Sequence, residues 1–177
     1  TWTATATPGV TGFTPNGTNT IPVQTISTTG TTQGTVTYAI TPNATGCAGP
    51  VANYTVLVDP IPTVTNNPLT QTICSGQSTT LVNLTSDVTG TTFAWTATAT
   101  PGVSGFTTSG TGTIPVQTIS TTGTSQGTVT YAITPTAAGC PGAVTNYSVF
   151  VDPLPTVTNN PLVQSICSGG TTSLVTL

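Results

Sequence analysis

Apolar and polar residues alternate along several short stretches of the chain, and Thr is the usual polar partner. The clearest stretch is residues 127–135, GTVTYAITP, where Val129, Tyr131 and Ile133 share one face. Residues 93–100 and 143–153 alternate in the same way. Because side chains of a strand point to its two faces in turn, this period of two predicts half-buried β-strands.

Further strands are expected in the stretch bounded by Pro60 and Pro153. They cover residues 61–73, 79–86 and 113–120, with a weak strand or loop at 106–111. Pro68 restricts the first of these to an edge or a bulge. About seven short strands separated by turn residues are typical of an antiparallel, immunoglobulin-like β-sandwich.

The whole pattern occurs twice. Trp2 and Trp95 stand 93 residues apart, and residues 1–84 align with 94–177 without a gap and with 64 identities. A repeat of this length predicts tandem β-sandwich domains stacked end to end. We expect a partial repeat at 1–60, a complete repeat at 61–153 and the start of a third at 154–177, as in a piece of a longer repeating chain.

Two joins connect these repeats, VDPIPTV at 58–64 and VDPLPTV at 151–157. Each contains a Pro-x-Pro pair, formed by Pro60 with Pro62 and by Pro153 with Pro155. Proline fixes the φ angle and stiffens a linker. The joins are therefore expected to be rigid.

In each repeat we expect one Trp and one Tyr in the core, Trp2 with Tyr38 and Trp95 with Tyr131. A buried Trp on the third strand is typical of immunoglobulin-like sandwiches. The alternative for these aromatic residues is a surface that stacks on sugar.

The charged residues are three aspartates, Asp59, Asp87 and Asp152, and the chain contains no Lys, Arg, His or Glu. Without basic side chains it cannot neutralise phosphates, so nucleic acid is excluded as a partner. No apolar run is long enough for a membrane helix. Catalysis needs a base, a nucleophile or a metal in a working arrangement, but the aspartates are isolated and the Ser and Thr hydroxyls have no base beside them, so we expect neither an enzyme nor a cofactor or metal.

Four cysteines fall in two motifs, ICSG at Cys74 and Cys167 and GC in a hairpin loop at Cys47 and Cys140. In an exported protein they are disulfide candidates. We expect a Cys74–Cys140 pair, with partners for Cys47 and Cys167 outside residues 1–177. In a simple immunoglobulin topology these two motifs lie at opposite ends, so a bond between neighbouring units or chains is the alternative.

The motif series ICSGQSTTL, FAWTATATPGVSGF, TIPVQTIS, GTVTYAITPTAAGC and YSVFVDPLPTV resembles the PKD-like, immunoglobulin-like repeats of very large secreted proteins of Bacteroidota. The resemblance covers the whole chain. It implies export by a type IX secretion system, display at the cell surface, and a role in adhesion or gliding.

The leading hypothesis is a structural repeat segment of an extracellular filament or giant adhesin, whose partners are neighbouring repeats or identical subunits. It forms a stalk that resists proteases, since trypsin-like enzymes find no Lys or Arg to cut. One alternative is a module that binds polysaccharide or another surface. An alternative assembly is a small subunit polymerised by β-strand complementation.

Overall fold

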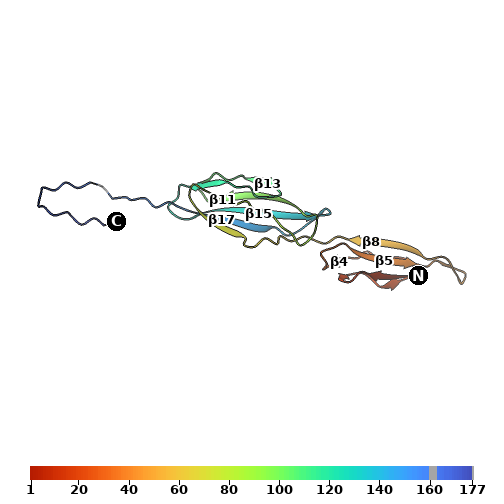
Figure 1. The fold of residues 1–177 in the computed structure, drawn as a ribbon. Helices are drawn as coiled ribbons and strands as arrows, with labels where there is room; N and C mark the ends of the chain where they lie inside the picture. The colour runs from red at the N-terminus through yellow and green to blue at the C-terminus, as the bar shows by residue number, and fades with distance from the viewer. Residues whose placement is uncertain (160–162, 177) are drawn as a thin grey trace.

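The computed structural model describes residues 1–159 and 163–176. These residues form seventeen strands and no helix, and so they include no helix long and apolar enough to cross a membrane. Three parts lie in a row in chain order (Figure 1). We call residues 1–60 the N-terminal unit, residues 61–153 the central unit and residues 154–177 the C-terminal segment.

The strands of the N-terminal unit are β1 (Trp2–Ala6), β2 (Val10–Thr11), β3 (Asn16–Gly17), β4 (Ser27–Thr28), β5 (Gly34–Ile40), β6 (Asn43–Ala44), β7 (Cys47–Ala48) and β8 (Ala52–Val58). Those of the central unit are β9 (Thr70–Cys74), β10 (Gln77–Ser78), β11 (Thr92–Ala99), β12 (Val103–Ser104), β13 (Ser109–Thr111), β14 (Thr118–Thr121), β15 (Gly127–Ala137), β16 (Cys140–Pro141) and β17 (Thr145–Asp152). The described residues of the C-terminal segment contain no strand.

The central unit consists of two sheets. The larger has the order β13-β11-β15-β17-β9, with β16 also beside β15, and the smaller has the order β10-β14-β12. All neighbours are antiparallel except β9 and β17, which are parallel. The fold is therefore all-β and immunoglobulin-like, as the alternating pattern predicts.

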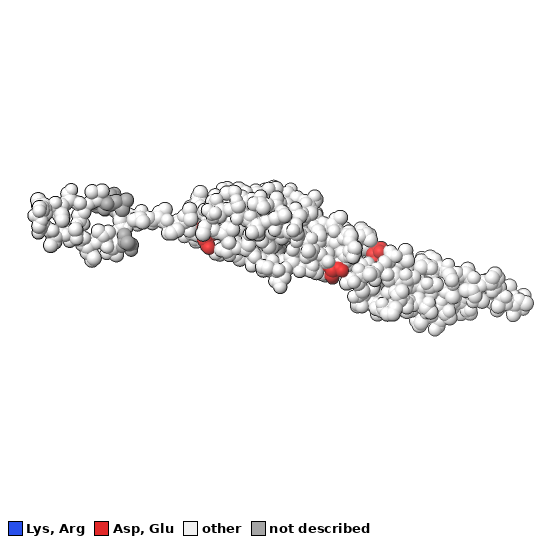
Figure 2. Space-filling model, in the orientation of Figure 1, with Lys and Arg blue, Asp and Glu red and all other residues white. Residues whose placement is uncertain are grey.

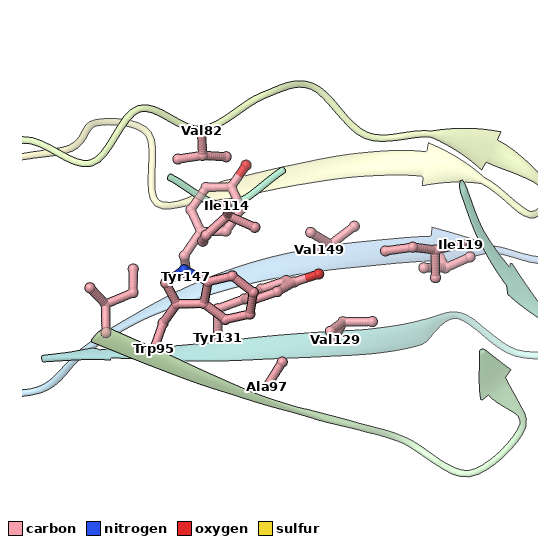
Figure 3. Close-up of a cluster of buried hydrophobic side chains, with 11 residues drawn as sticks. Val82, Trp95, Ala97, Ile114, Ile119, Val129, Tyr131, Tyr147 and Val149 are labelled. Atoms are coloured by element: carbon pink, nitrogen blue, oxygen red, sulfur yellow. The ribbon is translucent and has the colours of Figure 1, made fainter. Parts of the chain in front are cut away.

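The core of the central unit lies between these sheets (Figure 3). Strand β15 buries every second residue along its length, and the Trp95 ring packs edge-on against Tyr131 with centroids 5.5 Å apart. Gly110 lies opposite Trp95 on β13, where a Cβ atom would come within 2.3 Å of the indole ring. Glycine at this position makes room for the buried Trp.

The expected strand at 61–73 is divided in the structure. Val64 forms a bridge to Ser86, and the chain then moves to the other sheet, where β9 pairs with β17. Pro68 lies between the two pairings, and its lack of an N–H group prevents one continuous ladder.

The expected strand at 79–86 is also irregular. Strand β10, which pairs with β14, ends at Ser78 and so lies just before it, and within residues 79–86 only Val82 and Ser86 pair, in isolated bridges to Ile114 and Val64. Pro115 interrupts the partner segment, because proline cannot donate a backbone hydrogen bond. For the same reason the expected strand at 113–120 is shortened to β14.

The N-terminal unit repeats this plan in part. Its larger sheet has the order β3-β1-β5-β8, and two smaller pairs, β2-β4 and β6-β7, accompany it. Trp2 and Tyr38 are 5% and 1% exposed and lie in a second, smaller core cluster. In this sheet β8 is an edge strand, whereas its counterpart β17 lies between β15 and β9.

Candidate interaction surface

The N-terminal unit exposes a face that is covered in the central unit. Tyr54 is 54% exposed, whereas its counterpart Tyr147 is 4% exposed. Ile26 is half-buried, and its counterpart Ile119 is fully buried. The difference arises because residues 70–84 lie over this face in the central unit. We call the uncovered face of the N-terminal unit the open face.

A hollow of about 390 Å³ lies on the open face. Its polar centre is Gln24, whose Oε1 accepts a hydrogen bond of 3.2 Å from the hydroxyl of Tyr38. The rest of its lining is mainly apolar. The lining residues are Ile21, Pro22, Gln24, Ile26, Tyr38, Tyr54 and Val56.

Residues 70–84, which we call the covering segment, lie over the equivalent face of the central unit and form backbone hydrogen bonds to both sheets. On the larger sheet, β9 pairs with β17 from Thr70 to Cys74. On the smaller sheet, Gly76 N donates to Ile119 O at 2.8 Å, and Val82 exchanges bonds of 3.0 and 3.1 Å with Ile114. This segment therefore closes the sandwich by satisfying polar groups that an edge leaves unpaired.

A buried glutamine connects the covering segment to the core. Gln117 is 8% exposed, and its Nε2 donates to the Tyr131 hydroxyl at 3.0 Å. Its Oε1 accepts from the backbone N–H of Thr107, and its own N–H donates to Thr79 Oγ1 at 2.9 Å. Burial raises the pKa of Tyr131, although the bond from Gln117 acts in the opposite direction.

The join between the N-terminal and central units is packed against the central unit. Pro60 is buried and Pro62 is less than 2% exposed. Gly142 lies directly against this join, since a Cβ atom there would come within 1.9 Å of Pro62 O and 2.9 Å of Pro135 Cγ. The hairpin loop after β15 therefore forms a cradle for the join that requires glycine.

An aspartate fixes the same join electrostatically. Asp87 accepts 2.8 Å and 2.9 Å bonds from the backbone N–H and the hydroxyl of Thr63. The backbone bond from Thr63 is the main reason that the pKa of Asp87 lies below its usual value of 3.8. At the second join, Pro153 is half-buried and Pro155 is exposed.

The other two aspartates lie within the joins themselves. Asp59 and Asp152 each accept a 2.7 Å bond from a glutamine side chain, Gln33 and Gln126 respectively. The carboxylates are isolated red spots on an otherwise uncharged surface (Figure 2). Within residues 1–159 and 163–176, no three His, Cys, Asp or Glu side chains gather as a metal site requires.

The expected Cys74–Cys140 disulfide is wrong. Both thiols are free, as are those of Cys47 and Cys167. Cys74 lies beside Asp152, where the chain leaves the central unit, whereas Cys140 follows the far end of β15, near the cradle for the incoming join. The length of β17 separates them, about 24 Å at 3.4 Å per residue, whereas a disulfide requires Cα atoms within about 7 Å.

Sequence reasoning missed three features of this surface. It did not assign Gln24 or Gln117 to the core, did not connect Asp87 with Thr63, and did not identify Gly142 as the cradle of the join. The repeat itself could have indicated the glutamine, because a polar residue at a fixed place between Ile21 and Ile26 recurs between Ile114 and Ile119.

Comparison with known families gives one match. The profile of a family described as PKD-like domain matches residues 1–62 and 71–155, which is most of the chain and includes both units. Among curated proteins, no match was found.

Proposed function

The chain belongs to the PKD-like domain family, and we propose that it is a structural repeat segment of an extracellular filament or giant cell-surface adhesin. Successive units form a stalk that resists proteases, with neighbouring repeats or identical subunits as partners. PKD-like domains commonly occur in extracellular proteins, which supports an extracellular location. The proposal includes export by a type IX secretion system in a member of the Bacteroidota, which is what the resemblance described above implies.

The burial of the first join is the observation that carries this proposal. Pro62 is enclosed by the loop that contains Gly142, and Thr63 is bonded to Asp87. A linker that packs on the following domain has few conformations left, because proline has already fixed its φ angles. Units joined in this way stay in line, which is the mechanical requirement of a stalk.

The surface chemistry supports the same role. The chain lacks the Lys and Arg residues at which trypsin-like proteases cut, and its three carboxylates lie at the two joins (Figure 2). A surface with little charge lacks one defence against association, and in a filament that association is useful.

The alternative role, a module that binds carbohydrate or another surface, has less support. Trp2 and Trp95 would be the natural platforms for a sugar ring, but they are only 5% and 3% exposed. Their rings pack on Tyr38 and Tyr131 inside the two cores. We therefore place a structural role first.

Electron microscopy of the purified 177-residue chain tests the proposal. We expect two units in line with a narrow range of angles between them. The double variant Pro60→Gly/Pro62→Gly is the matched control and should broaden that range. Compact particles, or equally broad angles in both proteins, would contradict a stalk.

Proteolysis and localisation supply independent readouts. Proteinase K should cut within residues 163–176, which are exposed, and leave both units intact for much longer. Antibodies raised against the chain should label filaments outside the cells that make it. Rapid loss of both units, or label confined to the cytoplasm, would count against the proposal.

A further inference from the structure

We propose that two copies of the chain pair face to face through the outer face of the larger sheet of the central unit. In this pairing the Phe150 ring of each copy enters a hollow on the other copy. The inference deepens the function proposed above and rests on it for its biological setting, because it names the surface through which neighbouring stalks adhere.

The outer face is the side of the larger sheet that points away from the core. On β11 the outward residues alternate with the buried Trp95 and Ala97, and all four of them are exposed. The neighbouring strands β11, β15 and β17 (Figure 1) bring their outward residues together in rows across the sheet. One row crosses four strands and consists of Thr98, Thr130, Ser148 and Thr70. The outer face is therefore a broad surface lined by hydroxyl groups.

The outer face carries almost no charge. Its outward residues on β11 and β15 are all Thr or Ala, and within the described strands of this sheet Asp152, at the end of β17, is the one carboxylate. A hydroxyl group both donates and accepts hydrogen bonds, so two copies of such a face can satisfy each other. Because like charges are absent from the middle of the face, the pairing meets little electrostatic repulsion.

Phe150 is the residue of this face that the core does not explain. It stands on β17 between the buried Val149 and Val151, so its side chain points away from the core. An apolar residue, Leu57, occupies the same place in the N-terminal unit. The other aromatic side chains of the central unit belong to its core cluster or pack against it, namely Phe93, Trp95, Phe106, Tyr131 and Tyr147. An outward aromatic ring on an uncharged surface is typical of the centre of a protein interface.

A second hollow, of about 540 Å³, lies on the same face, and we call it the outer hollow. It is at the end of the sheet nearer the first join, and its lining is mainly apolar. Its outward lining residues lie side by side on β11, β13 and β15, and they are Thr92, Ala94, Thr111 and Thr136. The outer hollow therefore suits an apolar side chain.

Phe150 cannot fill the outer hollow of its own copy. Phe150 lies opposite Thr128 on β15, and Thr136 of the hollow is eight residues further along that strand. At about 3.4 Å per residue, ring and hollow are separated by about 27 Å. A two-fold axis in the plane of the interface, midway between ring and hollow and perpendicular to the line that joins them, exchanges the two places. Each ring then meets the hollow of the other copy, which is the self-complementary contact of a symmetric dimer.

The size of the outer face predicts weak pairing. Five strands about 4.8 Å apart, each with about eight residues of 3.4 Å, give a face of roughly 650 Å². A standard interface buries about 800 Å² per copy, so we expect dissociation in the micromolar range or above. Weak contacts add up when many units lie side by side along two stalks, because each further pairing is intramolecular.

Three variants of the 177-residue chain test this inference. Phe150→Thr removes the ring and keeps a residue that favours strands. Ala94→Glu places a charged side chain in the outer hollow. Leu81→Thr is the matched control for the first change, because Leu81 is 52% exposed and precedes the buried Val82, so that its side chain points outward on the smaller sheet. All three side chains point away from the core, and circular dichroism should show that each variant keeps the fold.

Sedimentation equilibrium over a range of concentrations gives the dissociation constant of each protein. We expect the unmodified chain and Leu81→Thr to form dimers of the 17.6 kDa chain, with little dependence on salt because the face carries almost no charge. Phe150→Thr and Ala94→Glu should each dimerise about tenfold more weakly, because an anchoring ring is lost or excluded. Equal dissociation constants for Phe150→Thr and Leu81→Thr would overturn the inference.

Mixing the two weakened variants separates this mechanism from other kinds of association. Phe150→Thr keeps its hollow and Ala94→Glu keeps its ring, so the mixture restores one of the two contacts. A heterodimer of about 35 kDa should therefore form more tightly than either homodimer. A mixture that pairs no more tightly than its components would refute the contact between ring and hollow. A chain that is monomeric at every concentration, or that binds a polysaccharide on this face in place of a second copy, yet is rigid and resistant to proteases, would overturn this inference and leave the proposed function standing.

Discussion

Replacing Gln117 by Leu should destabilise the central unit far more than replacing Gln24 by Leu destabilises the N-terminal unit. The two glutamines occupy equivalent places, but Gln117 is 8% exposed, whereas Gln24 is half-buried and lies beside the hollow of the open face. The pair therefore isolates the effect of the covering segment on one hydrogen-bonded side chain.

The magnitude follows from the bonds that are lost. Leu at position 117 removes the 3.0 Å bond to Tyr131 and leaves the backbone N–H of Thr107 without its acceptor. An unmade buried bond costs about 1–3 kcal/mol, and the extra apolar burial of Leu offsets part of this. We expect a net loss of about 2–3 kcal/mol at Gln117, against less than about 1 kcal/mol at Gln24, where water can replace the side chain.

Each unit contains one Trp, which gives a separate fluorescence signal for each. In a Trp2→Phe background only Trp95 reports, and in a Trp95→Phe background only Trp2 reports. Urea unfolding should be followed with each of these two signals in turn. With a slope of about 1–2 kcal/mol per molar, the midpoint of the central unit should fall by about 1–3 M.

Equal shifts in the two units would refute the reasoning, because burial would then not determine the cost. A double-mutant cycle with Tyr131→Phe gives a second check. The hydrogen bond between Gln117 and Tyr131 predicts that the two changes are not additive, with a coupling above about 0.5 kcal/mol. Additive effects would show that this contact contributes nothing to stability.

Two further predictions concern the join and the pH dependence of stability. Gly142→Ala should destabilise the central unit by about 1–3 kcal/mol in the same urea assay, because the added methyl group collides with Pro62 O. An unchanged stability would contradict the packing of the join. Burial raises the pKa of the Tyr131 hydroxyl above its usual value of 10.0. The neutral side chain therefore contributes its full stability below pH 10, and this contribution is lost as the pH rises through the raised pKa. Thermal melts in alkaline buffers would detect the loss.

The sequence was sufficient to predict the regular strands of the central unit. Residues 93–100, 127–135 and 143–153 were expected as strands, and the structure has β11, β15 and β17 there. These three strands lie next to one another in the larger sheet, and each buries one face only. A strand of that kind carries the period of two that makes it recognisable.

Residues 61–84, which include the covering segment, were harder to predict because they pair with strands of both sheets. The expected single strand at 61–73 pairs on both sides of Pro68 with different partners, and its ends are fixed by tertiary contacts rather than by local pattern. The cysteine pairing failed for a related reason. Spacing along the chain does not show that Cys74 and Cys140 lie at opposite ends of the same sheet.

The parallel pairing of β9 with β17 determines how a unit responds to tension. The chain enters at one end of the central unit and leaves at the other, so a pull on its two ends draws β9 and β17 in opposite directions along their common axis. The hydrogen bonds between them are then loaded in shear, all at the same time, and do not open one after another like a zipper. A stalk built from such units resists sudden stretching, and the order of the ladder gives it a breaking strength that its modest core would not provide.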